Sequence, residues 1–409
     1  MSNDTNTPPP NGYKYSAVGI IPLEWEVMRL GETGKVVTGN TPSRTDLSLW
    51  NGDFCWATAK DFKEKYINDT VEKITEKGCN GARLLPKGAI LITCIASIGN
   101  NAIAAVPLAT NQQINSIVVS DDFNNEWLYY QLDFYKQNLE LLASKTAVPL
   151  INKSEFEKLK LPIPPLPEQQ KIAEILSTWD DAITNCKNTI ITLKDRNKGL
   201  AQQLLTGKKR LSGFSEKWAV KKIKDFSLEI SIKNKNDDAL IVLSCTKHNG
   251  LVPSLEYFGR KIYSDNLKTY KIVEKDVFAY ATNHIEEGSI GYQSKYEKAL
   301  ISPMYTVFKT EESINDEFLF RVLKSNTYIQ EYQKRMEGSI DRRGGLRWQE
   351  FSKIKVNVPS YEEQSAIALV LETADQELKS YETKLEALQL QKKGLMQQLL
   401  TGKIRVNVN

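Results

Sequence analysis

The stretch GLAQQLLTGKKRL, from Gly199 to Leu211, occurs a second time as GLMQQLLTGKIRV, from Gly394 to Val406. Around it, residues 168–208 align without a gap to residues 363–403, an offset of 195, with 18 of 41 positions identical. A repeat at a fixed offset dictates the architecture of a chain. Because there are only two copies, too few for a solenoid, the sequence predicts a duplicated protein with pseudo-twofold symmetry.

Both copies carry apolar residues at alternating steps of four and three, the strict heptad of a coiled-coil seam. Each helix is expected to span about 38 residues, or about 57 Å at 1.5 Å per residue. Pro167 before the first helix and a Thr-Gly pair after each helix are start and stop signals. The predicted seam consists of Ile172, Leu176, Trp179, Ile183, Ile190, Leu193, Leu200 and Leu204, matched by Ile367, Leu371, Leu378, Tyr381, Leu385, Leu388, Leu395 and Leu399.

The direction of the two helices follows from the segment that joins them, residues 209–360. A compact domain of about 150 residues has a radius of gyration near 15 Å, so it bridges neighbouring helix ends easily and would be strained across a whole helix. The sequence therefore predicts an antiparallel coiled coil with one globular domain at each end.

The sequence does not explain two pairs of residues in the helices. Asn197 and Lys392 occupy aligned polar positions that a parallel pair would bring together, which counts against the antiparallel arrangement unless each faces another protein or water. Gly199 and Gly394 lie inside the helices, where glycine costs about 1 kcal/mol relative to alanine. Either a close approach by another chain or a tolerated local weakness would account for both glycines.

The duplication continues more faintly outside the helices. Trp25 matches Trp218, and the tripeptide Ser-Ile-Gly occurs at 97–99 and again at 289–291. Short β-branched and aromatic runs between turn-forming residues predict small mixed α/β domains. The expected α+β chain has a disordered tail (1–19), a first variable domain (20–160), a first conserved helical region (161–208), a second variable domain (209–355) and a second conserved helical region (356–409).

Composition narrows the class of protein. The chain has 409 residues, a net charge of +4 and 41% hydrophobic residues, and its longest apolar run, near 89–97, is far shorter than a membrane span. Its five scattered cysteines suit reduced thiols in the cytoplasm. It has no phosphate loop, no dinucleotide fingerprint, and only two histidines, His248 and His284. We therefore expect neither catalysis nor a bound metal.

Basic and polar loops suggest nucleic acid as the partner. Lys208, Lys209 and Arg210 open a lysine-rich stretch suited to neutralising phosphates, although a solvated surface is the plain alternative. Asn, Gln and Arg side chains in loops suit base edges, although each is also a common turn former. The candidate DNA-binding residues are Asn40, Thr41, Ser43, Arg44, Lys60, Asn111, Gln112, Lys247, Asn249, Asn283, His284, Arg342, Arg343 and Arg347.

Two variable domains alternating with two similar helices that close on LLTGK resemble the specificity subunit of type I restriction–modification systems. Residues 38–62 and 109–119 look like part of one target recognition domain of that family, and residues 301–308 look like part of another branch. Residues 165–176, PLPEQQKIAEIL, resemble the family's helix opening. The second copy, PSYEEQSAIALVL, lacks the usual second proline, which leaves its helix start open.

The resemblance implies a non-catalytic, cytoplasmic subunit that contributes to phage defence. Such subunits read an asymmetric, bipartite site in double-stranded DNA with two recognition domains, and dock two adenine-N6 methyltransferase subunits on the paired helices. Restriction and translocase subunits join through that complex. S-adenosylmethionine, ATP and Mg²⁺ would act in the partners, with no cofactor in this chain. The competing interpretation is a coiled-coil assembly adaptor that does not read DNA.

Overall fold

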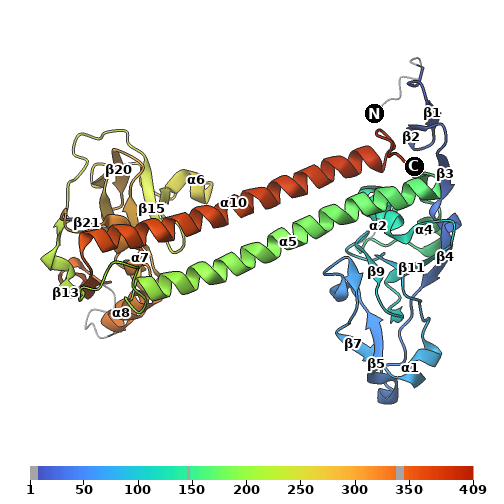
Figure 1. The fold of residues 1–409 in the computed structure, drawn as a ribbon, viewed down its shortest axis with the longest axis horizontal. Coiled ribbons are helices and arrows are strands. Elements are labelled where there is room, and N and C mark those ends of the chain that lie inside the picture. Colours follow the sequence, from blue (N-terminus) through green and yellow to red (C-terminus); the bar gives the residue numbers. More distant parts are fainter. Residues whose placement is uncertain (1–7, 145–147, 338–344, 409) are drawn as a thin grey trace. The chain divides into compact units, whose positions relative to one another are not determined.

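The computed structural model describes residues 8–144, 148–337 and 345–408 (Figure 1). The chain divides into unit 1, which comprises 1–188 and 383–409, and unit 2, which comprises 189–382. Two 39-residue helices, α5 (Leu166–Leu204) and α10 (Tyr361–Leu399), contribute to both units. Each unit therefore combines one globular α/β part with a portion of each long helix.

Unit 1 contains one five-stranded and one three-stranded sheet. The five-stranded sheet has the order β4 (Gly34–Thr38), β11 (Ile114–Val119), β8 (Ile90–Thr93), β9 (Asn101–Ala104) and β6 (Tyr66–Ile67). The three-stranded sheet has the order β10 (Leu108–Thr110), β5 (Trp50–Ala57) and β7 (Glu72–Ile74), with β10 parallel to β5. The remaining elements are the β1–β2 hairpin (Tyr13–Ser16, Gly19–Pro22), the β3–β12 pair (Glu26–Arg29, Lys160–Ile163), helices α1 (Glu76–Gly81), α2 (Asn125–Phe134), α3 (Lys136–Leu142) and α4 (Lys153–Glu157), and 3-10 helices η1 (Leu30–Glu32), η2 (Leu47–Leu49) and η3 (Ala59–Asp61).

Unit 2 repeats this plan. Its first sheet has the order β14 (Ser227–Ile230), β21 (Tyr305–Thr310), β18 (Val277–Ala281) and β19 (Ile290–Gln293). Its second has the order β16 (Gly250–Pro253), β15 (Val242–Thr246), β20 (Lys298–Ile301) and β17 (Lys271–Glu274), with β15 parallel to β20 as β5 is to β10. The other elements are the β13–β22 pair (Ala219–Lys222, Lys355–Val358), helices α6 (Ser254–Phe258), α7 (Asp316–Leu323), α8 (Asn326–Glu337) and α9 (Trp348–Phe351), and 3-10 helices η4 (Ile223–Asp225) and η5 (Ile285–Glu287). The predicted duplication of the globular parts is confirmed.

The hydrophobic core of each unit includes residues from the start of one long helix and from the end of the other. In unit 1, Ile172 and Leu176 from α5 are buried together with Met396 and Leu399 from α10. In unit 2, Leu204 from the end of α5 is buried with Ile367 and Leu371 from the start of α10. Within each unit the two helices therefore run antiparallel, as the connection between them predicted.

The same three-residue cluster secures this arrangement in both units. In unit 1, the Glu168 carboxylate accepts hydrogen bonds from Trp25 Nε1 at 2.9 Å and from the guanidinium of Arg405. In unit 2, Glu363 accepts from Trp218 Nε1 at 3.1 Å and from Arg210. Both carboxylates are almost wholly buried, at 1% exposed, so the hydrogen bonds and the arginine charge offset the free-energy cost of burying them. Each cluster ties the beginning of one helix to the turn that follows the other.

The helix ends follow from local sequence. Gly207 and Gly402 have φ of +69° and +71°, the left-handed conformation that ends a helix, and their N–H groups bond to Leu204 and Leu399 carbonyls. The expectation that Pro167 precedes the first helix was wrong, because the helix begins at Leu166. Proline is tolerated inside the first turn, where its missing N–H would have no intrahelical partner.

The two polar seam residues find partners on the opposite helix. Asn197 Nδ2 donates to the Ala374 carbonyl at 2.8 Å, and Lys392 Nζ pairs with Asp180 Oδ1 at 2.5 Å. Neither residue therefore counts against the antiparallel arrangement, and the alternative left open by the sequence, that each faces another protein or water, is not what the structure shows. The aligned positions remain separate in the antiparallel pair, and each is satisfied by a different group.

The predicted disordered tail also needs correction. Residues 1–7 lie outside the described part, but Tyr13–Ser16 forms a strand paired with Gly19–Pro22. The Tyr13 hydroxyl donates to the Gly402 carbonyl at 3.1 Å, so residues near the two ends of the chain meet within unit 1. Backbone pairing and this anchor order a segment that its composition predicts to be loose. All five cysteines are free thiols, and no described helix is long and apolar enough to cross a membrane.

Candidate nucleic-acid interface

The loops that carry the candidate DNA-binding residues of unit 1 lie together at one edge of its sheets. Thr38 at the end of β4 pairs with Asn115, and Thr93 at the end of β8 pairs with Ile114, so these strand ends meet at the start of β11. Asn111 N donates to the Ala57 carbonyl at 3.1 Å, which adds the end of β5. The structure thus gathers the loops containing residues 39–44, 58–60, 94–100 and 111–113, which we call the unit 1 loop edge.

Several candidate side chains in unit 1 build the loops themselves. Asn40 donates from Nδ2 to the Gly81 carbonyl at 2.6 Å and accepts at Oδ1 from Arg83 N at 3.0 Å. The Thr41 hydroxyl bonds to Gln112 Oε1, and Asn111 Oδ1 accepts from Gln113 N at 3.1 Å. The Thr41–Gln112 contact joins the β4–β5 loop to the β10–β11 turn, and Asn40 joins the same loop to the end of α1, so the polar groups also fix the shape of the edge.

Arg44 lies in an aromatic and acidic setting that the sequence did not indicate. Its Nη1 and Nη2 contact the two carboxylate oxygens of Glu72 at 2.5 and 3.1 Å. Its guanidinium lies 3.8 Å from the ring centre of Trp50 and 4.9 Å from that of Trp56. The hydrogen bond with Glu72 raises the pKa of Arg44 and lowers that of Glu72. Ser43, whose hydroxyl lies 2.9 Å from that of Thr45, and exposed Lys60 complete the unit 1 candidates.

Unit 2 presents the corresponding edge. Ala281 at the end of β18 pairs with Tyr305 at the start of β21, and Thr282 Oγ1 donates to the Met304 carbonyl at 3.0 Å. Leu346 N donates to the Thr282 carbonyl at 2.9 Å, which brings Arg347 to the same place. The β15–β16 turn and the β18–β19 loop present the remaining exposed candidates, which are Lys247, Asn249, Asn283 and His284. Arg342 and Arg343 lie outside the described residues.

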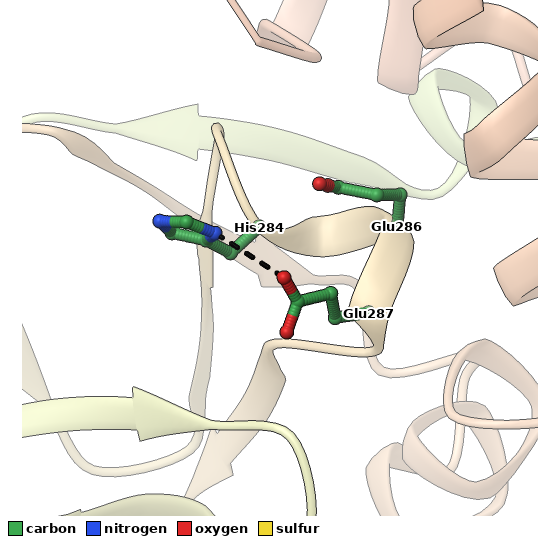
Figure 2. Close-up of side chains that lie close together, drawn as sticks. All are labelled: His284, Glu286 and Glu287. Atoms are coloured by element: carbon green, nitrogen blue, oxygen red, sulfur yellow. Dashed lines mark ion pairs between the residues drawn. The ribbon is translucent and has the colours of Figure 1, made fainter.

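His284 has acidic neighbours on its own turn (Figure 2). Its Nδ1 lies 3.6 Å from Glu287 Oε1, and one ligand atom from each of His284, Glu286 and Glu287 lies within 4.8 Å of the others. Three groups from one largely exposed turn are fewer than the four ligands of a structural zinc site. We assign no metal to this turn, and its two carboxylates oppose the approach of a phosphate.

The proposed phosphate contacts near the end of α5 need one correction. Arg210 is held by Glu363 through bonds of 2.5 and 2.6 Å and is only 25% exposed, so it is a structural ion pair rather than a free cation. Lys208 and Lys209, next to it in sequence, are exposed. The sequence did not reveal the difference, because the partner of Arg210 lies 153 residues away in the chain.

The predicted seam residues differ in burial along the helices. In α5, Trp179 and Leu200 are half-buried, whereas buried side chains are Ile172, Leu176, Ile183, Ile190, Leu193 and Leu204. In α10, the buried ones are Ile367, Leu371 and Leu399. The half-buried ones in α10 are Leu378, Tyr381, Leu385, Leu388 and Leu395.

Comparison with known proteins places this arrangement in a family. The sequence model of the type I restriction modification DNA specificity domain matches residues 22–195 and 208–390. The MjaIX specificity subunit of Methanocaldococcus jannaschii is 37% identical over 182 residues, which are 43% of this chain and 42% of that protein. The MjaVIII specificity subunit of the same organism is 25% identical over 417 residues, which are 95% of each chain.

Solved structures share the fold. The HsdS subunit from Thermoanaerobacter tengcongensis superposes with a TM-score of 0.57 at 15% identity, covering 94% of this chain and 98% of that one. The S subunit from M. genitalium gives a TM-score of 0.54 at 18% identity, covering 92% and 96%. Two copies of the family domain account for most of the sequence and correspond to the two repeated units. The chain therefore belongs to the family of non-catalytic DNA specificity subunits of type I restriction–modification enzymes.

Proposed function

We propose that each unit reads one half of an asymmetric, interrupted site in double-stranded DNA through its loop edge. The recognition domains would be residues 20–160 and 209–355, separated by conserved helical regions. The observation that carries this proposal is the pairing of one scaffold with two different sets of loops. The β10–β11 turn of unit 1 presents Asn111 and Gln112, whereas the corresponding β20–β21 turn of unit 2 presents Ser302 and Met304.

Differences between equivalent loops suit two recognition domains with different targets, because loops vary while the scaffold positions them. Phosphate contacts would set the register and base-edge contacts the sequence. Asn111 and Gln112 suit adenine, and Arg347 suits guanine. In this proposal Arg44 presents a preorganised guanidinium to the DNA, since Trp50 and Glu72 already fix its plane.

We further propose that the paired helices dock two methyltransferase subunits, and that restriction and translocase subunits join through them in the cytoplasm. S-adenosylmethionine, ATP and Mg²⁺ would be bound by those partners. Helix length would then set the number of unread base pairs between the half-sites, because the rise per residue is fixed. Deleting one heptad from each helix should change that spacer, and an unchanged spacer would contradict this role.

The direct test is to map methylated adenines in DNA modified by the chain with its methyltransferase. We expect one bipartite sequence. Asn111→Ala should relax only the half read by unit 1, and Asn283→Ala only the other half, with Lys158→Ala, an exposed lysine that follows α4 and pairs with Glu155, as a control. An assembly that methylates without sequence preference, together with no gel shift of the complex on its mapped site, would favour the alternative of an assembly adaptor without DNA readout.

A further inference from the structure

One lysine in unit 2 holds two loop-edge segments from behind. Lys324 directly follows α7, and its Nζ donates to the carbonyls of Thr246, Gly288 and Ile290 at 3.2, 2.6 and 3.1 Å. An ammonium has three donors, and here all three meet backbone oxygens. The side chain is half-buried, and burial lowers its pKa. Such an arrangement fixes backbone positions more firmly than a mobile surface lysine could.

The three carbonyls belong to the two segments that present the unit 2 candidates. Thr246 is the last residue of β15 and precedes the turn with Lys247 and Asn249. Gly288 and Ile290 follow the turn with Asn283 and His284. Lys324 therefore connects two candidate DNA-binding loops, around Lys247 and around Asn283, that are about 35 residues apart in sequence.

The backbone around Lys324 leaves little room for the two segments to shift. A Cβ added to Gly291 would lie 2.6 Å from Leu251 N, which shows how closely β19 approaches β16. Gln333 Nε2 of α8 donates to the Glu286 carbonyl at 3.2 Å, on the same loop. The loop therefore rests on both α7 and α8, and Lys324 is the contact that also reaches the β15–β16 turn.

Unit 1 also has a lysine that contacts the loop between the equivalent strands, although not at the aligned position. Lys136, the first residue of α3, donates from Nζ to Asn100 Oδ1 at 2.7 Å in the β8–β9 loop. Its Cγ would lie 2.7 Å from a Cβ on Gly99, which has φ of +81°, so the lysine stem packs directly on the loop. That loop adjoins the turn with Asn111 and Gln112, since Cys94 N donates to the Gln113 carbonyl at 2.9 Å. Both supported loops contain Ser-Ile-Gly.

We propose that Lys324 is a positioning residue for DNA readout by unit 2, and that Lys136 has the same role in unit 1. Neither lysine needs to touch DNA. Each holds the loops of its own unit in the one arrangement that matches a particular base sequence. The inference rests on the proposed function, and it adds that selectivity at each half-site depends on a separate internal support.

The test measures selectivity at each half-site separately. The complex with methyltransferase is assembled with wild-type chain, Lys324→Met, Lys136→Met and, as a matched control, Lys353→Met, an exposed lysine paired with Glu350. Binding is measured to the mapped site and to sites with one substitution in either half. We expect Lys324→Met to reduce discrimination about tenfold in the unit 2 half alone, the order of magnitude of the loss at a single mismatch. Lys136→Met should do so in the other half alone.

General loosening of unit 2 is separated from loop positioning by amide hydrogen exchange. Lys324→Met should accelerate exchange at 246–250 and 283–290 while β18 and β21 remain as protected as in the wild type. Unchanged discrimination in both halves, or equal acceleration throughout unit 2, would overturn the positioning role. If the wild-type complex itself shows no preference for any sequence, the proposed function fails before this inference is reached.

Discussion

Glu168 and Arg405 lie 237 positions apart in sequence and form a two-point ion pair, with Arg405 Nε and Nη2 at 2.7 and 2.9 Å from the two carboxylate oxygens. The carboxylate is 1% exposed, whereas the arginine side chain is 34% exposed. The hydrogen bond with Glu168 raises the pKa of Arg405 above its usual value. It joins the start of α5 to the segment after α10, which makes it the contact on which the antiparallel arrangement in unit 1 most directly depends.

We predict that Arg405→Ala destabilises unit 1 by about 3 kcal/mol, the lower end for a buried carboxylate that loses its partner. The measurement is the denaturant midpoint of the first unfolding transition. Lys403→Ala, an exposed neighbour, serves as the control. Adding Glu168→Gln should recover much of the loss, because no buried charge then remains unpaired, and a double variant as unstable as the single one would contradict the explanation.

Asn197 should limit the stability of the helix pair in unit 2. Replacing it with leucine removes one hydrogen bond to the Ala374 carbonyl but restores an apolar seam, so we expect a higher melting temperature. Lys392→Leu in unit 1 should lower the melting temperature, because it leaves the Asp180 carboxylate, which is 30% exposed, without its cation. Thermal melts of both variants test the contrast, and a shift of the same sign in both would show that the seam position alone decides the outcome.

The interior glycines offer a test of what contacts the helix surface. Nothing lies within 4 Å of a Cβ added at Gly199 or Gly394, so alanine at either position should stabilise the isolated chain by about 1 kcal/mol. Gly402→Ala is the matched opposite, since its Cβ would lie 2.5 Å from Pro22 Cδ at a φ of +71°. Assembly with the methyltransferase then separates the two explanations for the glycines. Unimpaired assembly of Gly394→Ala favours a tolerated weakness, and impaired assembly favours a close approach by a partner.

The Arg44–Glu72 pair should give unit 1 a dependence on acidic pH. Hydrogen bonding from Arg44 lowers the folded-state pKa of Glu72. Its stabilisation is therefore fully present above the unfolded glutamate pKa, near 4.3, and is lost as the pH falls through the lower folded value. Because both side chains are 39–51% exposed, we expect Glu72→Gln to cost less than about 1 kcal/mol at pH 7.

Unfolding curves of wild type and Glu72→Gln between pH 7 and pH 2.5 test this dependence. The difference between the two should stay constant down to about pH 5 and disappear at the acidic end. A difference that grows as the pH falls would contradict the direction of the pKa shift. The fluorescence of Trp50, over which the Arg44 guanidinium lies, offers a second readout of the same pair.

The two long helices could be predicted because their heptad pattern is set by residues close together in sequence. Their antiparallel direction could be predicted because the number of residues between them limits how far apart their ends can lie. The repeat predicted the two Thr-Gly helix ends, and the structure has a left-handed glycine at each. Specific partners could not be predicted. The sequence left the partner of Lys392 open, and the structure pairs it with Asp180, which is 212 residues away.

The loop edge shows the same limit. The sequence indicated Arg44 and Asn40 by residue type alone. Only the fold shows that Arg44 pairs with Glu72, and that the side chain of Asn40 is hydrogen-bonded to Gly81 and Arg83. Lys324 and Lys136 were not selected, because a lysine that binds backbone carbonyls or an amide leaves no pattern of its own in sequence. The repeated Ser-Ile-Gly tripeptide was visible, and it marks the loops that these two lysines support.

The contact between Tyr13 and Gly402 bears on the order in which the protein folds as it leaves the ribosome. Met396, Leu399 and Leu400 are part of the core of unit 1, so the core of the domain synthesised first is complete only after these residues emerge. Unit 2 is complete at residue 382 and can close earlier. Vectorial synthesis thus favours maturation of the second domain ahead of the first, the reverse of the usual order.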